Sequence, residues 1–232
     1  MGIRCAYSAV TNVELVKHSN TCLVGRAVIG DAWAPAEIAA QVESGGVAKA
    51  RNDTLTTLVL AMLAGAFIAL GAAFYLVVVR GSNLGLGVTR LLGGVAFSTG
   101  LILVVVAGAE LFTGNNLIAI AWASGRVTMR QLLRNWVLVY IGNVAGALGT
   151  VALVGLAGVD ELGDGAVRTT AVAIGRSKAE LGTVPAVALG MLCNTLVCLA
   201  VWLAIGGRTV TDKILAIVFP ITAFVTLSLI HI

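Results

Sequence analysis

The chain contains long uncharged apolar runs that are separated by segments with charged residues. They cover residues 54–79, 91–109, 135–159, 181–207 and 214–232, and the sequence stops inside the last one. About 20 apolar residues in a helix cross the hydrocarbon core of a bilayer. The pattern therefore predicts a transmembrane helix over each run.

A further uncharged run, 111–125, follows Glu110 and is too short to span alone. Together with 91–109 it forms an apolar region too long for one straight helix and shorter than the roughly 40 residues that a two-span hairpin needs. We therefore expect one span that is broken near Thr113-Gly114-Asn115. Non-helical backbone at membrane depth is tolerated where it is buried in protein or lines a cavity.

Glu110 lies beside this break, and an ionisable residue inside a membrane indicates a functional site by default. The break and Glu110 together predict a pore or a substrate site. The alternative is that Glu110 caps or supports a helix end. Both interpretations can hold together.

Composition supports a membrane protein. Hydrophobic residues make up 59% of the 232 residues, charged residues 11%, and the mean hydropathy is +1.00. Soluble domains carry about 25% charged residues, so these values exclude a water-soluble or disordered chain. A membrane β-barrel is disfavoured because its strands alternate in polarity and are only about ten residues long. The expected fold class is an all-α polytopic membrane protein.

The net charge of +4 reflects topology rather than binding of nucleic acid. Ten of the fifteen Lys and Arg residues fall in the N-terminal segment and in the loops that contain Arg126 and Arg208. The other five lie in the remaining loops. Because cytoplasmic loops carry the excess of basic residues, the N-terminus is expected in the cytoplasm.

The segment before the first span has two parts. Residues 1–32 are unassigned, since charged residues interrupt every candidate signal-peptide core. Residues 35–43 predict a short amphipathic helix that begins at Pro35 and is stopped by Gly45-Gly46. It is expected to lie at the cytoplasmic membrane interface, and binding of a partner is the alternative.

Few residues suit catalysis or metal binding. No cysteine pair has zinc-ligand spacing, and no HExxH or GxSxG motif is present, so neither an enzyme nor a cofactor is expected. Cys193 and Cys198 are interpreted as small packing residues. Gly142 and Gly146 form a GxxxG pair, which favours close packing of two helices.

The stretch Gly-Ala-Glu-Leu-Phe-Thr-Gly-Asn at 108–115 resembles the signature of the formate/nitrite transporter family. Further matches keep register along the chain, and the resemblance covers about residues 33–228; they include Gly93-Gly94-Val95-Ala96-Phe97-Ser98, Asn135-Trp136, Gly142-Asn143, Leu192-Cys193-Asn194 and Val197-Cys198-Leu199-Ala200-Val201-Trp202. The resemblance assigns residues 33–232 to one membrane domain.

The resemblance implies an aquaporin-like bundle of six helices in two inverted halves, with the second and fifth helices broken. It also implies a homopentamer in the inner (plasma) membrane that moves small monovalent anions of weak acids, such as formate, nitrite, hydrosulfide, acetate or lactate. Relative to that pattern, the sequence ends within the fifth helix. We therefore expect a C-terminally incomplete chain, and an inactive fragment is one alternative function.

The family's functional positions carry over one at a time. The resemblance implies a cytoplasmic-side constriction at Leu111, Phe112 and Val197 and a periplasmic-side constriction at Phe97, Leu101 and Phe224. The implied polar groups are a pore-facing hydroxyl at Thr113, a structural amide at Asn194, an anion-attracting cation at Lys178 and a central pore histidine at His231. Around His231, however, Ser228, Leu229, Ile230 and Ile232 depart from the family pattern, so residues 228–232 are doubtful as native sequence.

The expected mechanism follows from the cost of moving an anion through an apolar slit. A charge in a low-dielectric site costs several kcal/mol even after relaxation, whereas a protonated acid is neutral. A histidine can share or donate that proton near physiological pH. A pore for neutral solutes such as water, glycerol or ammonia is the rival hypothesis, although the Asn-Pro-Ala motif of aquaporins is absent from the sequence.

Overall fold

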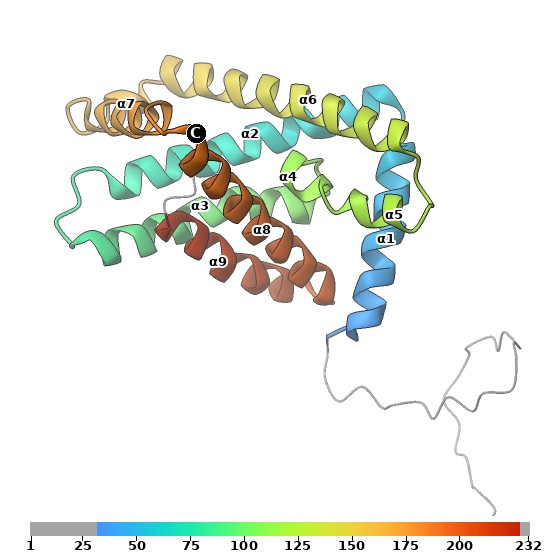
Figure 1. Ribbon diagram of the computed structural model, residues 1–232. Coiled ribbons are helices and arrows are strands. Elements are labelled where there is room, and N and C mark those ends of the chain that lie inside the picture. The colour runs from blue at the N-terminus through green and yellow to red at the C-terminus, as the bar shows by residue number, and fades with distance from the viewer. Residues whose placement is uncertain (1–31, 228–232) are drawn as a thin grey trace, which may run out of the picture.

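The computed structural model describes residues 32–227, and this part of the chain is helical throughout its regular elements (Figure 1). The helices are α1 (Pro35–Arg51), α2 (Thr54–Val79), α3 (Leu86–Ala107), α4 (Phe112–Asn115), α5 (Ile118–Ala123), α6 (Met129–Leu156), the 3₁₀ turn η1 (Val159–Glu161), α7 (Ala166–Ala179), α8 (Thr183–Gly206) and α9 (Val210–Thr226). Within the described residues, α2, α3, α6 and α8 are long and apolar enough to cross a membrane.

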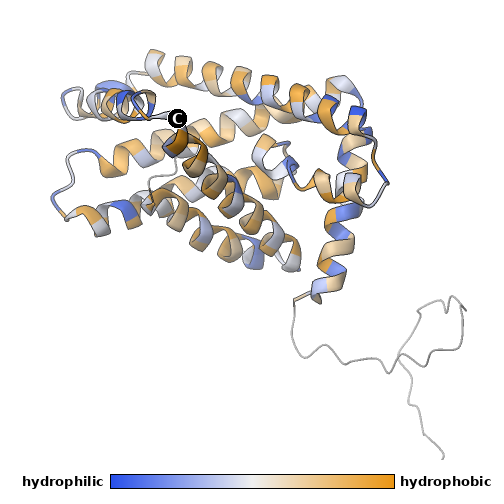
Figure 2. Cartoon of the chain, viewed as in Figure 1, coloured by the Kyte–Doolittle hydropathy of each residue, from blue (hydrophilic) through white to orange (hydrophobic). Residues whose placement is uncertain are grey.

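The spans lie side by side, and their outward faces are apolar. Figure 2 shows the long helices largely in orange, whereas α1 carries more blue. Large side chains such as Leu156, Leu203 and Phe219 are exposed on this outer surface. A surface of this kind suits contact with lipid, because exposing so much apolar surface to water is unfavourable.

Polar residues set the ends of the helices. Asp53 accepts a hydrogen bond from the Thr56 amide and caps α2, so the first predicted span is confirmed at both ends. Thr128 and Gln131 form a capping box that starts α6 six residues before the predicted run. The helix α3 also starts early, because Arg90 lies inside it and donates to the Thr226 carbonyl at 2.9 Å.

Glycines bring α2 and α6 into close contact. A side-chain carbon at Gly146 would lie 1.9 Å from the Met62 carbonyl oxygen, and one at Gly142 would lie 2.5 Å from the Ala61 side chain. On α2, a carbon at Gly65 would lie 2.0 Å from the Asn143 carbonyl oxygen. The GxxxG pair therefore packs helices together, as the sequence predicted.

The second span is broken, but earlier than expected. Helix α3 ends at Gly108, which takes a left-handed conformation with φ of 73°, and the chain is extended at Leu111 before α4 begins. Thr113, Gly114 and Asn115, where the break was predicted, instead form one helical turn. The non-helical residues 108–111 lie two to five residues before the predicted position, because Gly108 adopts the left-handed cap without a Cβ penalty.

Helix α1 lies across one end of the bundle and is longer than predicted (Figure 1). Pro35 starts it as expected, but Gly45-Gly46 does not stop it, and it continues to Arg51. The reason is packing: Gly46 is buried, and a Cβ there would lie 3.3 Å from both Ala121 and Ile118. The glycine lets α1 approach α5 closely, which outweighs its low helix propensity.

The basic loops meet α1 at this end. Arg126 pairs with Glu43 at 3.5 Å, Arg134 donates to the Asn52 carbonyl at 3.1 Å, and the Arg208 guanidinium lies 4.2 Å above the Trp33 ring. Helix α7 lies at the opposite end of the spans (Figure 1). The loops that the charge count assigned to one side of the membrane are thus gathered at one end of the molecule.

Candidate pore site

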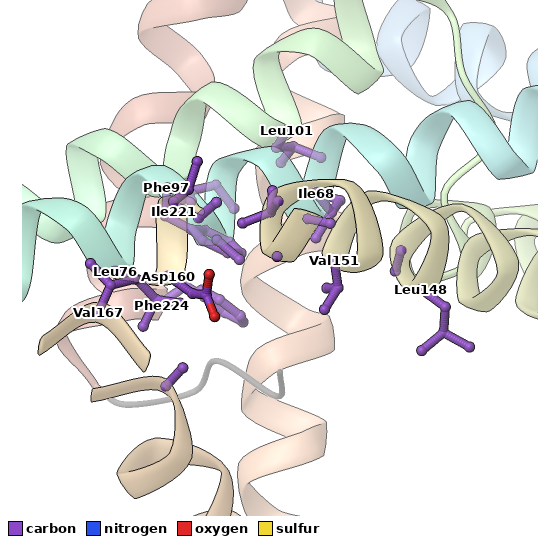
Figure 3. Close-up of a pocket in the computed structure, with 18 of the residues that line it drawn as sticks. Ile68, Leu76, Phe97, Leu101, Leu148, Val151, Asp160, Val167, Ile221 and Phe224 are labelled. Carbon is purple, nitrogen blue, oxygen red and sulfur yellow. The ribbon is translucent and has the colours of Figure 1, made fainter. Parts of the chain in front are cut away.

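An apolar cavity of about 710 Å³ lies between α2, α3, α6, α7, α8 and α9. Its polar lining residues are Thr113, Asp160 and Arg168, and the rest of the lining is aliphatic, aromatic, glycine or cysteine. Figure 3 shows side chains from several helices pointing into this space, among them Phe97, Leu101 and Ile221. A small solute in the cavity would therefore meet hydrocarbon on most sides.

The three residues predicted for the periplasmic-side constriction all line this cavity. Phe97 from α3 and Phe224 from α9 stack with ring centroids 5.7 Å apart and an interplanar angle of 22°. Leu101 lies one turn further along α3 and is buried with them in the main hydrophobic core. Residues far apart in the sequence thus form one aromatic and aliphatic wall.

Two of the three residues predicted for the cytoplasmic-side constriction also line the cavity. Leu111 is the extended residue before α4, and Val197 comes from the middle of α8. Thr113, in α4, lines the cavity beside them, and its backbone carbonyl accepts a hydrogen bond from the Cys198 thiol at 3.3 Å. The break therefore presents a threonine to a space that is otherwise apolar.

Phe112 takes a different position from its neighbours. Its ring lies edge-on to Trp136 and Tyr140 of α6, with centroids 6.3 Å and 5.6 Å away, and the residue is absent from the cavity lining. In this structure Phe112 anchors α4 to α6. Leu111 and Thr113, on either side of it, face the cavity.

Glu110 faces away from the cavity into a buried polar cluster. Its carboxylate accepts a hydrogen bond from the Asn115 amide and lies 3.4 Å from the Lys49 ammonium. Only 4% of the Glu110 side chain is exposed. This arrangement matches the interpretation that Glu110 supports a helix end.

The sequence analysis assigned no role to Asn143, yet this residue holds the broken span together. Its side-chain amide donates to the carbonyls of Ala61 and Glu110 at 2.8 Å and 2.9 Å, and its side-chain oxygen accepts from the Phe112 amide at 2.9 Å. Backbone groups freed at membrane depth need such partners. The signal available in the sequence was an asparagine within an apolar run.

Asn194 lies on α8, as expected, and its contacts are structural. Its side-chain oxygen accepts from the Asn116 amide at 2.6 Å, and the Cys198 thiol lies 3.9 Å from the same oxygen. These contacts fasten the link between α4 and α5 to α8. Asn116 and Cys198 were not predicted as partners of the break.

Charged residues gather at the end of the cavity near α7. Arg168 donates to Asp160 at 2.7 Å and to Glu161 at 2.5 Å. The hydrogen bond and charge of Arg168 hold the pKa of the partly buried Asp160 carboxyl below its usual range. Lys178 lies on α7 and is partly exposed, while His231 is outside the described residues.

Within residues 32–227, no three His, Cys, Asp or Glu side chains come close enough together to hold a metal ion.

Comparisons with known proteins agree with this architecture. The family model described as formate/nitrite transporter matches residues 36–232. The formate channel FocA of Escherichia coli strain K12 is 41% identical over 202 residues, which are 87% of this chain and 71% of that protein. The formate channel BtFdhC of Bacillus thuringiensis is 38% identical over 197 residues, which are 84% of this chain and 75% of that protein.

Two solved structures are similar in fold. A pentameric formate channel with formate bound has a TM-score of 0.71 and 42% identity, with 77% of this chain and 70% of that chain covered. An ion channel of the FNT family has a TM-score of 0.76 and 28% identity, with 84% and 78% covered.

The long apolar helices, the broken span and the apolar cavity define a multi-pass membrane protein of the transporter class, not an enzyme. With matches over most of the chain, this protein belongs to the formate/nitrite transporter family.

Proposed function

We propose that this protein conducts formate, or another small monovalent weak-acid anion such as nitrite, across the membrane through the cavity described above. The observation that carries the proposal is the convergence of Phe97, Leu101, Leu111, Val197 and Phe224 with Thr113 on one cavity. The similarity to FocA and to a pentameric formate channel supports formate as the substrate class.

The apolar lining favours passage of the neutral acid. A bare carboxylate in such a space loses hydration worth several kcal/mol, whereas the protonated acid loses only the hydrogen bonds of its polar atoms. In the proposed mechanism, Lys178 raises the local anion concentration at the outer mouth. His231 then donates a proton, and Thr113 offers its hydroxyl at the cavity wall.

The proposed transport unit is a homopentamer in the inner (plasma) membrane, with the N-terminus in the cytoplasm. Residues 33–232 form its membrane domain, and residues 1–32 are an extension outside it. In this proposal α3, α4 and α5 are the broken second helix of an aquaporin-like bundle, and α9 is the first half of the fifth. The gathering of Arg126, Arg134 and Arg208 around α1 supports the orientation.

Replacement of Thr113 by Val tests the function directly. The change keeps the shape of the side chain and removes its hydroxyl, so formate flux into proteoliposomes should fall about tenfold, which is the equivalent of one hydrogen bond. Flux is measured from pH 5 to pH 8, in about half-unit steps, to follow the supply of protonated acid.

Thr195→Val is the matched control, because Thr195 is exposed on α8 and its hydroxyl bonds to the Met191 carbonyl of its own helix at 2.8 Å. The control should transport as the unmodified protein does. Equal flux in Thr113→Val and Thr195→Val at every pH would reject the role of Thr113. Uptake of glycerol without uptake of formate by the unmodified protein would favour the neutral-solute pore instead.

A further inference from the structure

Lys49, near the end of α1, reaches the broken span. Its ammonium donates to the Asn115 side-chain oxygen at 2.9 Å and lies 3.4 Å from the Glu110 carboxylate. The Lys49 side chain is 39% exposed, whereas that of Glu110 is 4% exposed. The ion pair therefore joins a helix at the end of the bundle to a carboxylate inside it.

The contacts of Lys49 close into a ring. Asn115 donates to Glu110 and to the Asn135 side-chain oxygen, the latter at 3.0 Å. Asn135 in turn donates to the backbone carbonyl of Lys49 at 3.3 Å. Trp136 adds a hydrogen bond to the Asn115 carbonyl at 3.1 Å. One residue of α1 is thus bonded, through its ammonium and its carbonyl, to the break and to α6.

Leu111 and Thr113, which face the cavity, lie in the sequence between Glu110 and Asn115, the two residues of the break that Lys49 contacts. Leu111 follows Glu110 directly, and Thr113 precedes Asn115 by two residues. Whatever fixes Glu110 and Asn115 therefore fixes the segment that presents Leu111 and Thr113. A buried carboxylate that loses its counter-ion is strongly unfavourable, so removal of the ammonium favours movement of this segment.

We infer that Lys49 is a positioning residue of the pore: as counter-ion of Glu110 and donor to Asn115, it holds Leu111 and Thr113 against the cavity. Lys49 does not touch the cavity itself. Where the inference concerns transport, it rests on the proposed function. Its structural part, the position of the segment 110–115, does not depend on the substrate.

Lys49→Met tests the inference, because methionine keeps most of the side-chain length and removes the charge. The matched control is Glu43→Gln, which weakens another ion pair of α1, that with Arg126, without touching the break. The double variant Lys49→Met with Glu110→Gln removes both charges and relieves the unpaired carboxylate. If Lys49 and Glu110 interact, the effect of the double variant differs from the sum of the effects of the two single variants.

Formate flux into proteoliposomes is the first readout. Lys49→Met should lower flux about tenfold, and the double variant should return it to within about threefold of the unmodified protein, because neither charge is then left unpaired. Glu43→Gln should transport as the unmodified protein does. Equal flux in Lys49→Met and Glu43→Gln would overturn the inference.

The thiol of Cys198 gives a second readout that needs no transport. It donates to the Thr113 carbonyl, so displacement of the segment should expose it. In a background with Cys5, Cys22 and Cys193 replaced by Ala, Cys198 should react with N-ethylmaleimide about fivefold faster after Lys49→Met, and Glu43→Gln should leave the rate unchanged. An unchanged labelling rate in Lys49→Met would overturn the inference that Lys49 fixes the position of residues 110–115.

The two readouts distinguish failure of the proposed function from failure of the inference about Lys49. If the unmodified protein carries no formate, the proposed function fails, and labelling of Cys198 still decides whether Lys49 positions the segment. If Lys49→Met is not recovered in folded form, the double variant decides. Recovery of the folded double variant supports the counter-ion role, and loss of both variants while Glu43→Gln folds overturns it.

Discussion

At the scale of single residues, Asn143 supplies hydrogen-bond partners for three backbone groups at and beside the break. One side chain bonds the Phe112 amide, the Glu110 carbonyl and the Ala61 carbonyl. The first two belong to the break and the third to α2. Asn143, on α6, therefore joins three membrane segments through polar contacts that lipid cannot replace.

Asn143→Leu should destabilise the protein, because it keeps the number and branching of the side-chain heavy atoms and leaves the Phe112 amide without a partner. We expect the free energy of unfolding in mixed micelles to fall by about 1–3 kcal/mol. Thr150→Val is the control, since the buried Thr150 hydroxyl bonds only its own helix, at the Gly146 carbonyl. A change in Asn143→Leu no larger than that in Thr150→Val would contradict the assigned role.

The resemblance led to the cavity residues, but the sequence did not reveal the contacts behind them. Leu111, Thr113 and Val197 could be selected because they match a family pattern, and the structure places all three on the cavity. Asn143 was matched without a role, because an asparagine in an apolar run does not indicate which carbonyl it faces. The ion pair of Lys49 and Glu110 joins residues far apart in sequence, which a pattern along the chain does not bring together.

At the scale of helices, close contact between α2 and α6 depends on glycine. Gly146 leaves no room for a Cβ beside the Met62 backbone, whereas Gly149, three residues further along the same helix, has open space around it. Gly146 and Gly149 thus lie on the same helix, but only Gly146 is in close contact with another helix.

Gly146→Ala should separate α2 from α6, because backbone cannot yield as a flexible side chain does. We expect a loss of about 2 kcal/mol or more in the free energy of unfolding in mixed micelles. Gly149→Ala should be neutral or stabilising by up to about 1 kcal/mol, since alanine favours helix. Equal behaviour of the two variants would show that the contact with Met62 does not limit packing.

The positions of the spans were predictable from charge and hydropathy, but their ends were less so. The run 54–79 was confirmed because Asp53 and Arg80 lie just outside α2. The runs that began at 91 and 135 were too short, because Arg90 and Arg134 lie inside α3 and α6 and bond carbonyls of other segments. A charged residue ends an apolar run without ending the helix.

At the scale of the whole molecule, the two ends of the bundle differ in their basic loops. Arg126, Arg134 and Arg208 meet α1 at one end, and α7 with Lys178 lies at the other. If the first end faces the cytoplasm, as the positive-inside rule predicts, exposed positions at the two ends should be accessible from opposite sides of the membrane.

Cysteine labelling checks this orientation. In a background without native cysteines, Ser177→Cys on α7 should react with a membrane-impermeant maleimide added to intact cells. Ala123→Cys, at the end of α5 beside α1, should react only after lysis; both positions are exposed. The reverse pattern would place α1 outside and contradict the predicted orientation.

The asparagine that completes the broken span has a consequence for biogenesis. Asn143 follows Phe112 by 31 residues, so the ribosome adds the partner of that amide about 2–6 seconds later, at roughly 5–20 residues per second. During this interval the unfinished segment cannot rest in hydrocarbon with its polar groups satisfied. We therefore expect the segment after α3 to stay hydrated, or held by the insertion machinery, until α6 is made, so that the second and third spans enter the bilayer as one unit.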